Sequence, residues 1–143
     1  MYEKKLREAI EARKDGIARY LAEHGRFYPG QALPRRYRVA LPKNCYWNAR
    51  DLVTRSKGKL RYAEGLCYDG KSGYGFAPFE HAWALDAEDR VIDPTVQDSK
   101  GRSDAGYCGY FGAVIPLVKG ERLFPGGSLY RSPLWRAVYL SLA

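Results

Sequence analysis

Three residues of this sequence have the types and the order of a nucleophile, a base and an acid: Cys45, His81 and Asp93. A thiol attacks an amide carbonyl as thiolate, which forms near neutral pH when a helix N-terminus or an imidazolium lies beside it. A carboxylate that accepts a hydrogen bond from the imidazole fixes the tautomer and orientation of the ring. If the fold brings the three side chains together, they predict nucleophilic attack on an amide carbonyl by the Cys45 thiolate.

Cys45 falls in the first turn of a helix expected over residues 44–53, with Pro42 before it and Asn44 as a possible N-cap. The backbone N–H groups of a first helical turn have no partner within the helix and favour developing negative charge. The Cys45 amide could therefore form one half of an oxyanion hole. Asn44 or Gln31 could supply a side-chain donor for the other half.

His81 is the candidate base, because the sequence has two histidines and His24 has a simpler explanation. His24 lies at the end of an amphipathic helix, where a histidine suits the negative end of the helix dipole. His81 instead begins the apolar strand His-Ala-Trp-Ala-Leu, where a polar side chain is less expected. Taken alone, His81 could also be a structural histidine hydrogen-bonded at a strand end.

The register of one β-hairpin decides whether Asp93 can reach His81. Residues 80–86 and 90–95 are expected to form two strands joined by a three-residue turn at residues 87–89. This register pairs His81 with Thr95, and it makes His81 and Asp93 diagonal neighbours about 7–8 Å apart on one face. A turn of two or four residues would send the Asp93 side chain to the opposite face.

The acids of this hairpin also have readings without a catalytic role. Asp-Pro-Thr is favourable turn chemistry, so Asp93 could simply end its strand. Asp86, Glu88 and Asp89 are interpreted as solvated acids of the turn.

Further side chains near the three residues could contact a substrate. Trp47, Trp83 and Tyr46 flank the proposed nucleophile and base and could form the walls of a substrate groove, although aromatic side chains in such positions are commonly core residues. Glu64 stands within a strand-like apolar run, where it could line the cleft or bind an amine. The alternative for Glu64 is a buried structural pair with an arginine.

A structural zinc site is an alternative use of the cysteines, because Cys45, Cys67, Cys108 and His81 form a permissible ligand set. The sequence has no Cys-x-x-Cys spacing that would support such a site. We therefore expect neither a metal nor another cofactor, and we interpret Cys67 and Cys108 as small buried apolar residues.

The elements that must position these residues follow a helix-then-strands order. Apolar residues at helical spacing predict one amphipathic helix over residues 1–25, and three prolines and a glycine predict an irregular connection over residues 28–43 with one short strand at residues 37–41. Strands are expected at residues 60–68, 80–86, 90–95 and 109–118, with a glycine-rich loop at 69–78 and a strand or short helix at 128–143. This order predicts the α+β class, with N-terminal helices packed on an antiparallel β-sheet.

The size and composition favour one soluble domain over residues 1–143, with a catalytic core at residues 44–118. A chain of 143 residues suffices for one hydrophobic core. It has no run of about 18 apolar residues that could cross a membrane, and its N-terminus does not resemble a secretory signal. Three cysteines cannot all pair within one chain, which favours reduced thiols. We expect a cytoplasmic monomer.

The net charge of +8 is unevenly distributed. Residues 26–61 contain ten Lys and Arg residues against one acid, and residues 62–98 contain two against eight. Such a region favours anionic partners, either an acidic protein or peptide substrate or a nucleic acid bound through residues 35–61. A catalytically inert nucleic-acid-binding module is therefore the main alternative to an enzyme, although no recognised nucleic-acid motif is present. The simplest alternative is a solvated basic face that maintains solubility.

The sequence motifs around Cys45, His81 and Asp93 resemble those of a known family. A cysteine begins a helix, a strand then begins His-Ala-Trp at residues 81–83, and Val-Ile-Asp-Pro-Thr follows at residues 91–95. This pattern resembles the transglutaminase-like branch of the papain-like cysteine enzymes, over residues 44–95. The resemblance implies a helix carrying Cys45 packed on an antiparallel sheet, with His81 and Asp93 on adjacent strands. It also implies peptide cleavage, deamidation, crosslinking or acyl transfer through a thioester, without a required metal.

Overall fold

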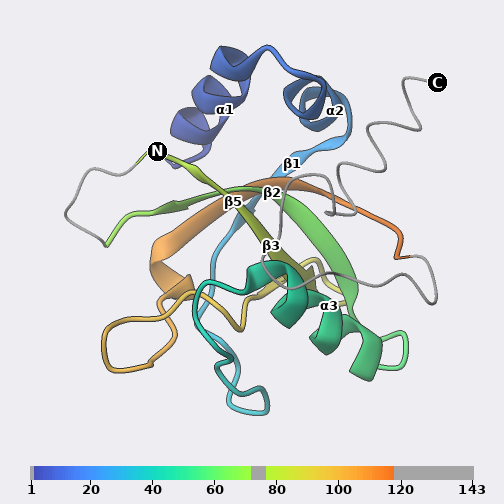
Figure 1. Ribbon diagram of the computed structural model, residues 1–143, viewed down its shortest axis with the longest axis vertical. Coiled ribbons are helices and arrows are strands. Elements are labelled where there is room, and N and C mark those ends of the chain that lie inside the picture. The colour runs from blue at the N-terminus through green and yellow to red at the C-terminus, as the bar shows by residue number, and fades with distance from the viewer. Residues whose placement is uncertain (1, 72–76, 118–143) are drawn as a thin grey trace.

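The computed structural model describes residues 2–71 and 77–117. Its helices are α1 (Tyr2–Arg13), α2 (Gly16–His24) and α3 (Cys45–Arg55), with a short 3-10 turn η1 (Ala105–Tyr107). Its strands are β1 (Arg26–Pro29), β2 (Arg61–Asp69), β3 (Phe79–Leu85), β4 (Val91–Ile92) and β5 (Cys108–Val114). The strands form one sheet in the order β1-β5-β2-β3-β4, and every pair is antiparallel. The predicted α+β class is confirmed (Figure 1).

The sheet is curved around an aromatic interior. One buried cluster takes residues from all five strands of the described sheet, among them Tyr28 of β1, Trp83 of β3, Val91 of β4 and Tyr110 of β5. The two edge strands lie close together, because the Gln31 amide just after β1 donates a hydrogen bond to the carbonyl of Val91 in β4. The sheet therefore has the form of a half-barrel whose inner face packs against itself.

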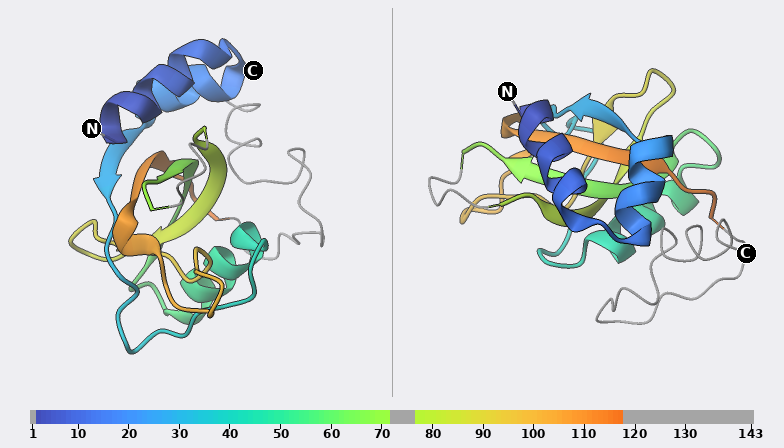
Figure 2. Two further views of the ribbon diagram at one scale, coloured as in Figure 1. Left: turned by 90° about the vertical axis from the view of Figure 1, so that its left-hand side faces the viewer. Right: turned by 90° about the horizontal axis from the view of Figure 1, so that it is seen from above.

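The helices cover the outer face of this curved sheet (Figure 2). Leu6 of α1 and Leu21 of α2 are fully buried in a cluster with Leu66 and Phe111 of the sheet. α3 lies on the opposite side of the molecule from α1 and α2, where its half-buried Leu52 packs against the outer side of β3 and β4. Alternate residues of each strand thus face the helices and the aromatic interior.

The predicted single helix over residues 1–25 is wrong, because the helix ends at Arg13 and a second one begins at Gly16. Lys14 between them has a left-handed backbone with φ of 54°. The Asp15 carboxylate then accepts a hydrogen bond of 2.7 Å from the Ala18 amide and caps α2. An aspartate that caps a new N-terminus competes with helix continuation, which the apolar spacing does not reveal.

The connection before α3 also differs from the prediction. Residues 37–41 are irregular, although a short strand was expected there. A strand that was not expected, β1, forms at Arg26–Pro29, where the irregular connection was predicted to begin. β1 has four residues and buries only Tyr28, so it is too short to give a clear alternating pattern. Residues 37–41 instead bond to the loop after β4, where the Ala40 amide donates to the Pro94 carbonyl.

The predicted register of the β3–β4 hairpin is confirmed. Leu85 pairs with Val91, and the Asp86 amide donates to the Arg90 carbonyl at 3.0 Å, which leaves a three-residue turn. Asp89, the last residue of that turn, has a left-handed backbone with φ of 61°. Three-residue hairpin turns commonly place their last residue in this conformation. The odd turn length keeps Asp93 on the face that the sequence analysis required.

The interpretation of Asp86 as a solvated turn acid is wrong, because Asp86 is 6% exposed. Its carboxylate accepts hydrogen bonds from the backbone amides of Glu88 and Arg90 and from the Arg90 guanidinium. A tight turn leaves amide groups that a short acidic side chain can satisfy. Asp86 therefore stabilises the turn. Glu88 is exposed as expected, and Asp89 is partly exposed.

The remaining expected elements are met in part. β2 and β5 correspond to the strands expected at residues 60–68 and 109–118, although β5 ends at Val114. The element expected at residues 128–143 lies outside the described residues, as do residues 72–76 of the glycine-rich loop. Within the described part of the chain, no helix is both long enough and apolar enough to span a membrane.

Candidate active site

Cys45, His81 and Asp93 come from three different elements that meet at one end of α3. Cys45 is the first residue of α3, His81 is the third residue of β3, and Asp93 directly follows β4. The hairpin register places His81 and Asp93 on the inner side of the sheet, with Trp83. The start of α3 therefore has to approach this hairpin for the three side chains to meet.

Asn48 holds the start of α3 against the hairpin. Its side chain is buried, and its amide nitrogen donates to the Thr95 hydroxyl at 3.1 Å and to the Leu41 carbonyl at 2.7 Å. Residues three apart lie on one side of a helix, so Asn48 fixes the side that carries Cys45. The register extended by three pairs places Thr95 opposite His81. Sequence reasoning missed Asn48, because its two partners are distant in the chain or irregular in structure.

His81 and Asp93 form a buried pair. The His81 Nε2 atom lies 2.8 Å from the Asp93 Oδ2 atom, and the two residues are 3% and 0% exposed. The Tyr110 hydroxyl donates to the same Oδ2 atom at 2.7 Å, and the Thr95 amide donates to Oδ1 at 2.9 Å. These donors fix the orientation of the carboxylate. Sequence reasoning did not identify Tyr110, since nothing within β5 indicates which distant side chain its hydroxyl contacts.

The charges of the pair reinforce each other. Burial lowers the pKa of His81, but the adjacent Asp93 carboxylate outweighs burial and raises that pKa to about 10. Burial raises the pKa of Asp93, whereas the His81 charge and the hydrogen bonds from His81, Tyr110 and Thr95 lower it more. At neutral pH the pair is therefore an imidazolium and a carboxylate.

Cys45 lies beside the imidazole of His81. A side-chain hydrogen bond between Cys45 and His81 also raises the pKa of His81. Since Nε2 is engaged by Asp93, Nδ1 is the ring nitrogen available to the Cys45 thiol. The structure thus brings together the three residues that the sequence pattern singled out.

Exposure distinguishes Cys45 from the other two cysteines. Cys45 is half-buried, whereas Cys67 and Cys108 are buried in the aromatic interior. Burial raises the pKa of Cys67, and contact with Cys108 raises it further. The interpretation of Cys67 and Cys108 as small buried residues is confirmed.

Comparison with known proteins finds no matching family model, curated protein or solved structure.

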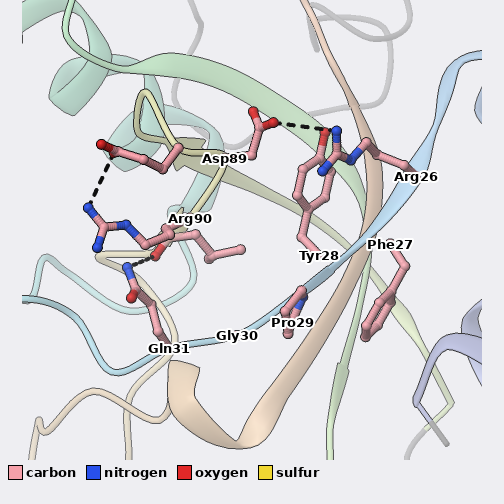
Figure 3. A pocket seen from close by; sticks show the side chains of 10 residues that line it. Arg26, Phe27, Tyr28, Pro29, Gly30, Gln31, Asp89 and Arg90 are labelled. Atoms are coloured by element: carbon pink, nitrogen blue, oxygen red, sulfur yellow. Dashed lines mark hydrogen bonds and ion pairs between the residues drawn. The ribbon is translucent and has the colours of Figure 1, made fainter.

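The two predicted side-chain donors for an oxyanion hole differ in their placement. Asn44 is half-buried at the N-cap of α3, next to Cys45, and its side chain makes no capping hydrogen bond. Gln31 instead donates its amide to the Val91 carbonyl at 2.9 Å (Figure 3). It lines a cavity between β1 and the β3–β4 hairpin that Cys45 does not line. The Gln31 amide thus joins two edges of the sheet, a contact that the sequence alone could not show.

The aromatic residues predicted as groove walls divide into an exposed and a buried set. Trp47, in the first turn of α3, is 52% exposed and can contact a substrate that approaches Cys45. Trp83 is fully buried, with its ring stacked 6.3 Å from the His81 ring, and is therefore a core residue that packs against His81. Tyr46 is half-buried and packs against the outer core cluster. Phe79, which the pattern did not single out, is 39% exposed and lies edge-on to His81 at 5.5 Å.

Glu64 does not line an open cleft, because it is 1% exposed on the outer side of β2. It accepts a hydrogen bond from the Tyr62 hydroxyl. Burial and the nearby Glu64 charge raise the pKa of Tyr46, and Cys45 contributes in the same direction. Glu64 therefore lies in the core close to the start of α3. A strand-like apolar run gives no sign of which of its faces is covered by helices.

The residues of the zinc alternative do not gather into a metal site. In residues 2–71 and 77–117, no group of three or more His, Cys, Asp or Glu side chains is arranged to hold a metal ion.

Proposed function

We propose that this protein is a cysteine hydrolase or acyltransferase that acts on an amide or peptide bond through a thioester at Cys45. The proposal is carried by one observation: the half-buried Cys45 at a helix start is hydrogen-bonded to the His81 imidazole, whose Nε2 atom is held by the buried Asp93 carboxylate. A helix start and an adjacent imidazole are typical surroundings of a catalytic cysteine.

The residues have distinct roles in the proposed reaction. The Cys45 sulfur attacks the amide carbonyl carbon, and the carbonyl oxygen becomes an oxyanion that the Cys45 backbone amide and the Asn44 side chain stabilise. The His81 imidazolium donates its proton to the leaving nitrogen, and collapse of the intermediate releases an amine and leaves a thioester on Cys45. Water or a second amine then attacks the thioester while His81 accepts a proton. Release of the acid or the new amide restores the Cys45 thiolate and the His81 imidazolium.

Asp93 acts as a positioning residue that holds His81. Its hydrogen bond at Nε2 keeps the other ring nitrogen directed to Cys45, and its charge stabilises the imidazolium. The Tyr110 hydroxyl and the Thr95 amide keep the carboxylate from rotating. Such a buried and fully engaged carboxylate matches the orienting acid of a catalytic triad.

Selective alkylation tests this proposal without knowledge of the substrate. The folded protein is treated with iodoacetamide at pH 7, and the modified cysteines are mapped by mass spectrometry over time. We expect Cys45 to react at least about tenfold faster than Cys67 and Cys108, which serve as internal controls, because a thiolate is the reactive form. His81→Ala should slow the reaction at Cys45. Equal and slow reaction of all three thiols would overturn the proposal.

A further inference from the structure

A second surface cavity lies at the other end of α3. It has a volume of about 370 Å³ and is lined by Arg36, Tyr37, Leu52, Arg55, Ser56, Lys57 and Lys59. This volume falls in the range of about 300–1,000 Å³ that is usual for ligand sites. We call it the cationic groove. None of the three residues at the candidate active site lines it.

The rim of the cationic groove carries excess positive charge. Four of its seven lining residues are exposed Lys or Arg side chains, and none is acidic. Arg55 is paired with Asp51 at 3.1 Å on the solvent side of α3. Lys57 and Lys59 lie in the segment that follows the end of α3 at Arg55. Within the described residues, no acidic side chain pairs with either lysine. The groove therefore attracts anionic groups.

The floor of the cationic groove is apolar. Tyr37 and Leu52 are half-buried and pack against the core cluster formed with Leu60, Ala84 and Ile92. A ligand that fits both rim and floor combines an apolar side chain with negative charges on either side. An acidic polypeptide segment that contains one apolar residue has this chemistry.

The state of the Tyr37 ring argues against single-stranded nucleic acid as the occupant. Single-stranded nucleic acids bind by stacking bases on free aromatic faces beside a basic track. The Arg36 guanidinium already lies over the Tyr37 ring at 5.0 Å, and the ring also packs into the core. The aromatic ring of the groove is therefore occupied, whereas Lys57 and Lys59 have no acidic partner among the described residues and can pair with carboxylates.

We propose that the cationic groove binds an acidic segment of the polypeptide substrate, and this inference rests on the proposed function of Cys45. Leu52 follows Cys45 by two turns on the same side of α3, so the groove and the thiol lie at opposite ends of one helix. A rise of about 1.5 Å per residue separates Cys45 from Arg55 by about 15 Å. An extended peptide spans that distance in about four or five residues, which places the acidic segment that far from the attacked amide.

Peptide binding to the full chain carrying Cys45→Ala tests the groove separately from turnover. The probe is a fluorescein-labelled peptide of sequence Glu-Glu-Leu-Asp-Glu, followed by fluorescence anisotropy at low and high salt. We expect saturable binding that weakens as salt rises. Lys57→Glu with Lys59→Glu should weaken it at least tenfold, and Lys57→Gln with Lys59→Gln should cause a smaller loss in the same direction. Lys100→Glu, in another exposed turn, is the matched control and should change binding less than twofold.

The outcomes separate this inference from the proposed function. Absence of binding, or binding that both Lys57/Lys59 double variants leave unchanged, overturns the inference. Tighter binding of a single-stranded oligonucleotide of equal charge also overturns it and favours a nucleic-acid site. If Cys45 is selectively alkylated in the wild type but the peptide does not bind, the proposed function stands without this groove. If the peptide binds but Cys45 is unreactive, the groove is a peptide site and the proposed chemistry fails.

Discussion

At the scale of single residues, the carboxylate of Asp93 is the most constrained group in the candidate site. A buried charge is tolerated only where hydrogen bonds and an opposite charge offset its lost hydration. Asp93 receives both, from the His81 imidazolium and from the Tyr110 hydroxyl and the Thr95 amide. The same partners that lower its pKa also fix the ring of the candidate base.

The Tyr110 hydroxyl offers a test of this constraint with little change in shape. Tyr110→Phe removes one donor to the buried carboxylate and should lower the free energy of unfolding by about 1–3 kcal/mol. The alkylation rate at Cys45 should also fall, because His81 is held less firmly. Urea unfolding and timed mass spectrometry measure the two effects.

The matched control for that variant is Tyr107→Phe, since Tyr107 is 52% exposed and its ring lies next to Lys71. Removal of its hydroxyl should change neither stability nor Cys45 reactivity appreciably. Equal behaviour of the two variants would contradict the role given to Tyr110.

At the scale of elements, the site depends on how α3 is anchored to the hairpin. Asn48 joins α3 to Thr95 and to the connection before the helix, and Gln97 adds a hydrogen bond of 2.8 Å to the Ala40 carbonyl. These contacts cross-link three segments that carry or support Cys45 and Asp93. The thiol and the imidazole therefore meet through polar contacts as well as apolar packing.

Asn48→Ala removes the anchor and leaves a small residue in the helix. We expect a loss of about 1–3 kcal/mol in the free energy of unfolding, because the buried Thr95 hydroxyl and Leu41 carbonyl lose their donor. The alkylation rate at Cys45 should fall as α3 gains freedom. Thr54→Ala, on the exposed side of the same helix, is the control for helix propensity. An unchanged alkylation rate in Asn48→Ala would show that packing alone places Cys45.

Local patterns predicted the elements that carry the candidate site. Pro42 and Asn44 indicated the start of α3, although the Asn44 side chain makes no capping hydrogen bond. The apolar strand pattern and a turn of odd length indicated the register of the hairpin. The break at Lys14 and strand β1 were missed, because one depends on a single capping aspartate and the other on four residues. Contacts such as Asn48 with Thr95 or Gln31 with Val91 join distant segments, and no local pattern specifies them.

At the scale of the whole molecule, the buried pair ties global stability to pH. The His81 pKa rises on folding from 6.5 to about 10, so its contribution to stability is fully present below pH 6.5 and is lost as pH rises through about 10. The Asp93 pKa falls below 3.8 on folding, so its contribution is present above that pH and is lost as pH falls through the folded value. The pair therefore stabilises the fold most between pH 3.8 and pH 6.5.

His81→Gln isolates the alkaline part of this dependence. We expect the difference in unfolding free energy between wild type and variant to shrink steadily from pH 6 to pH 10. Urea unfolding at pH 6, 8 and 10 measures that difference, and comparison with the variant removes the effects of other groups that titrate in this range. A difference that stays constant with pH would contradict an ion pair in the folded state.

The three-residue turn of the hairpin limits which insertions and deletions the protein can tolerate. Loss or gain of a single codon between Asp86 and Arg90 would exchange the two faces of everything that follows in the strand. The carboxyl group would then be delivered to the helical layer and His81 would lose its counter-ion. Insertion or deletion of one residue is harmless in most surface turns. In this turn it would change an odd length to an even one and separate Asp93 from His81.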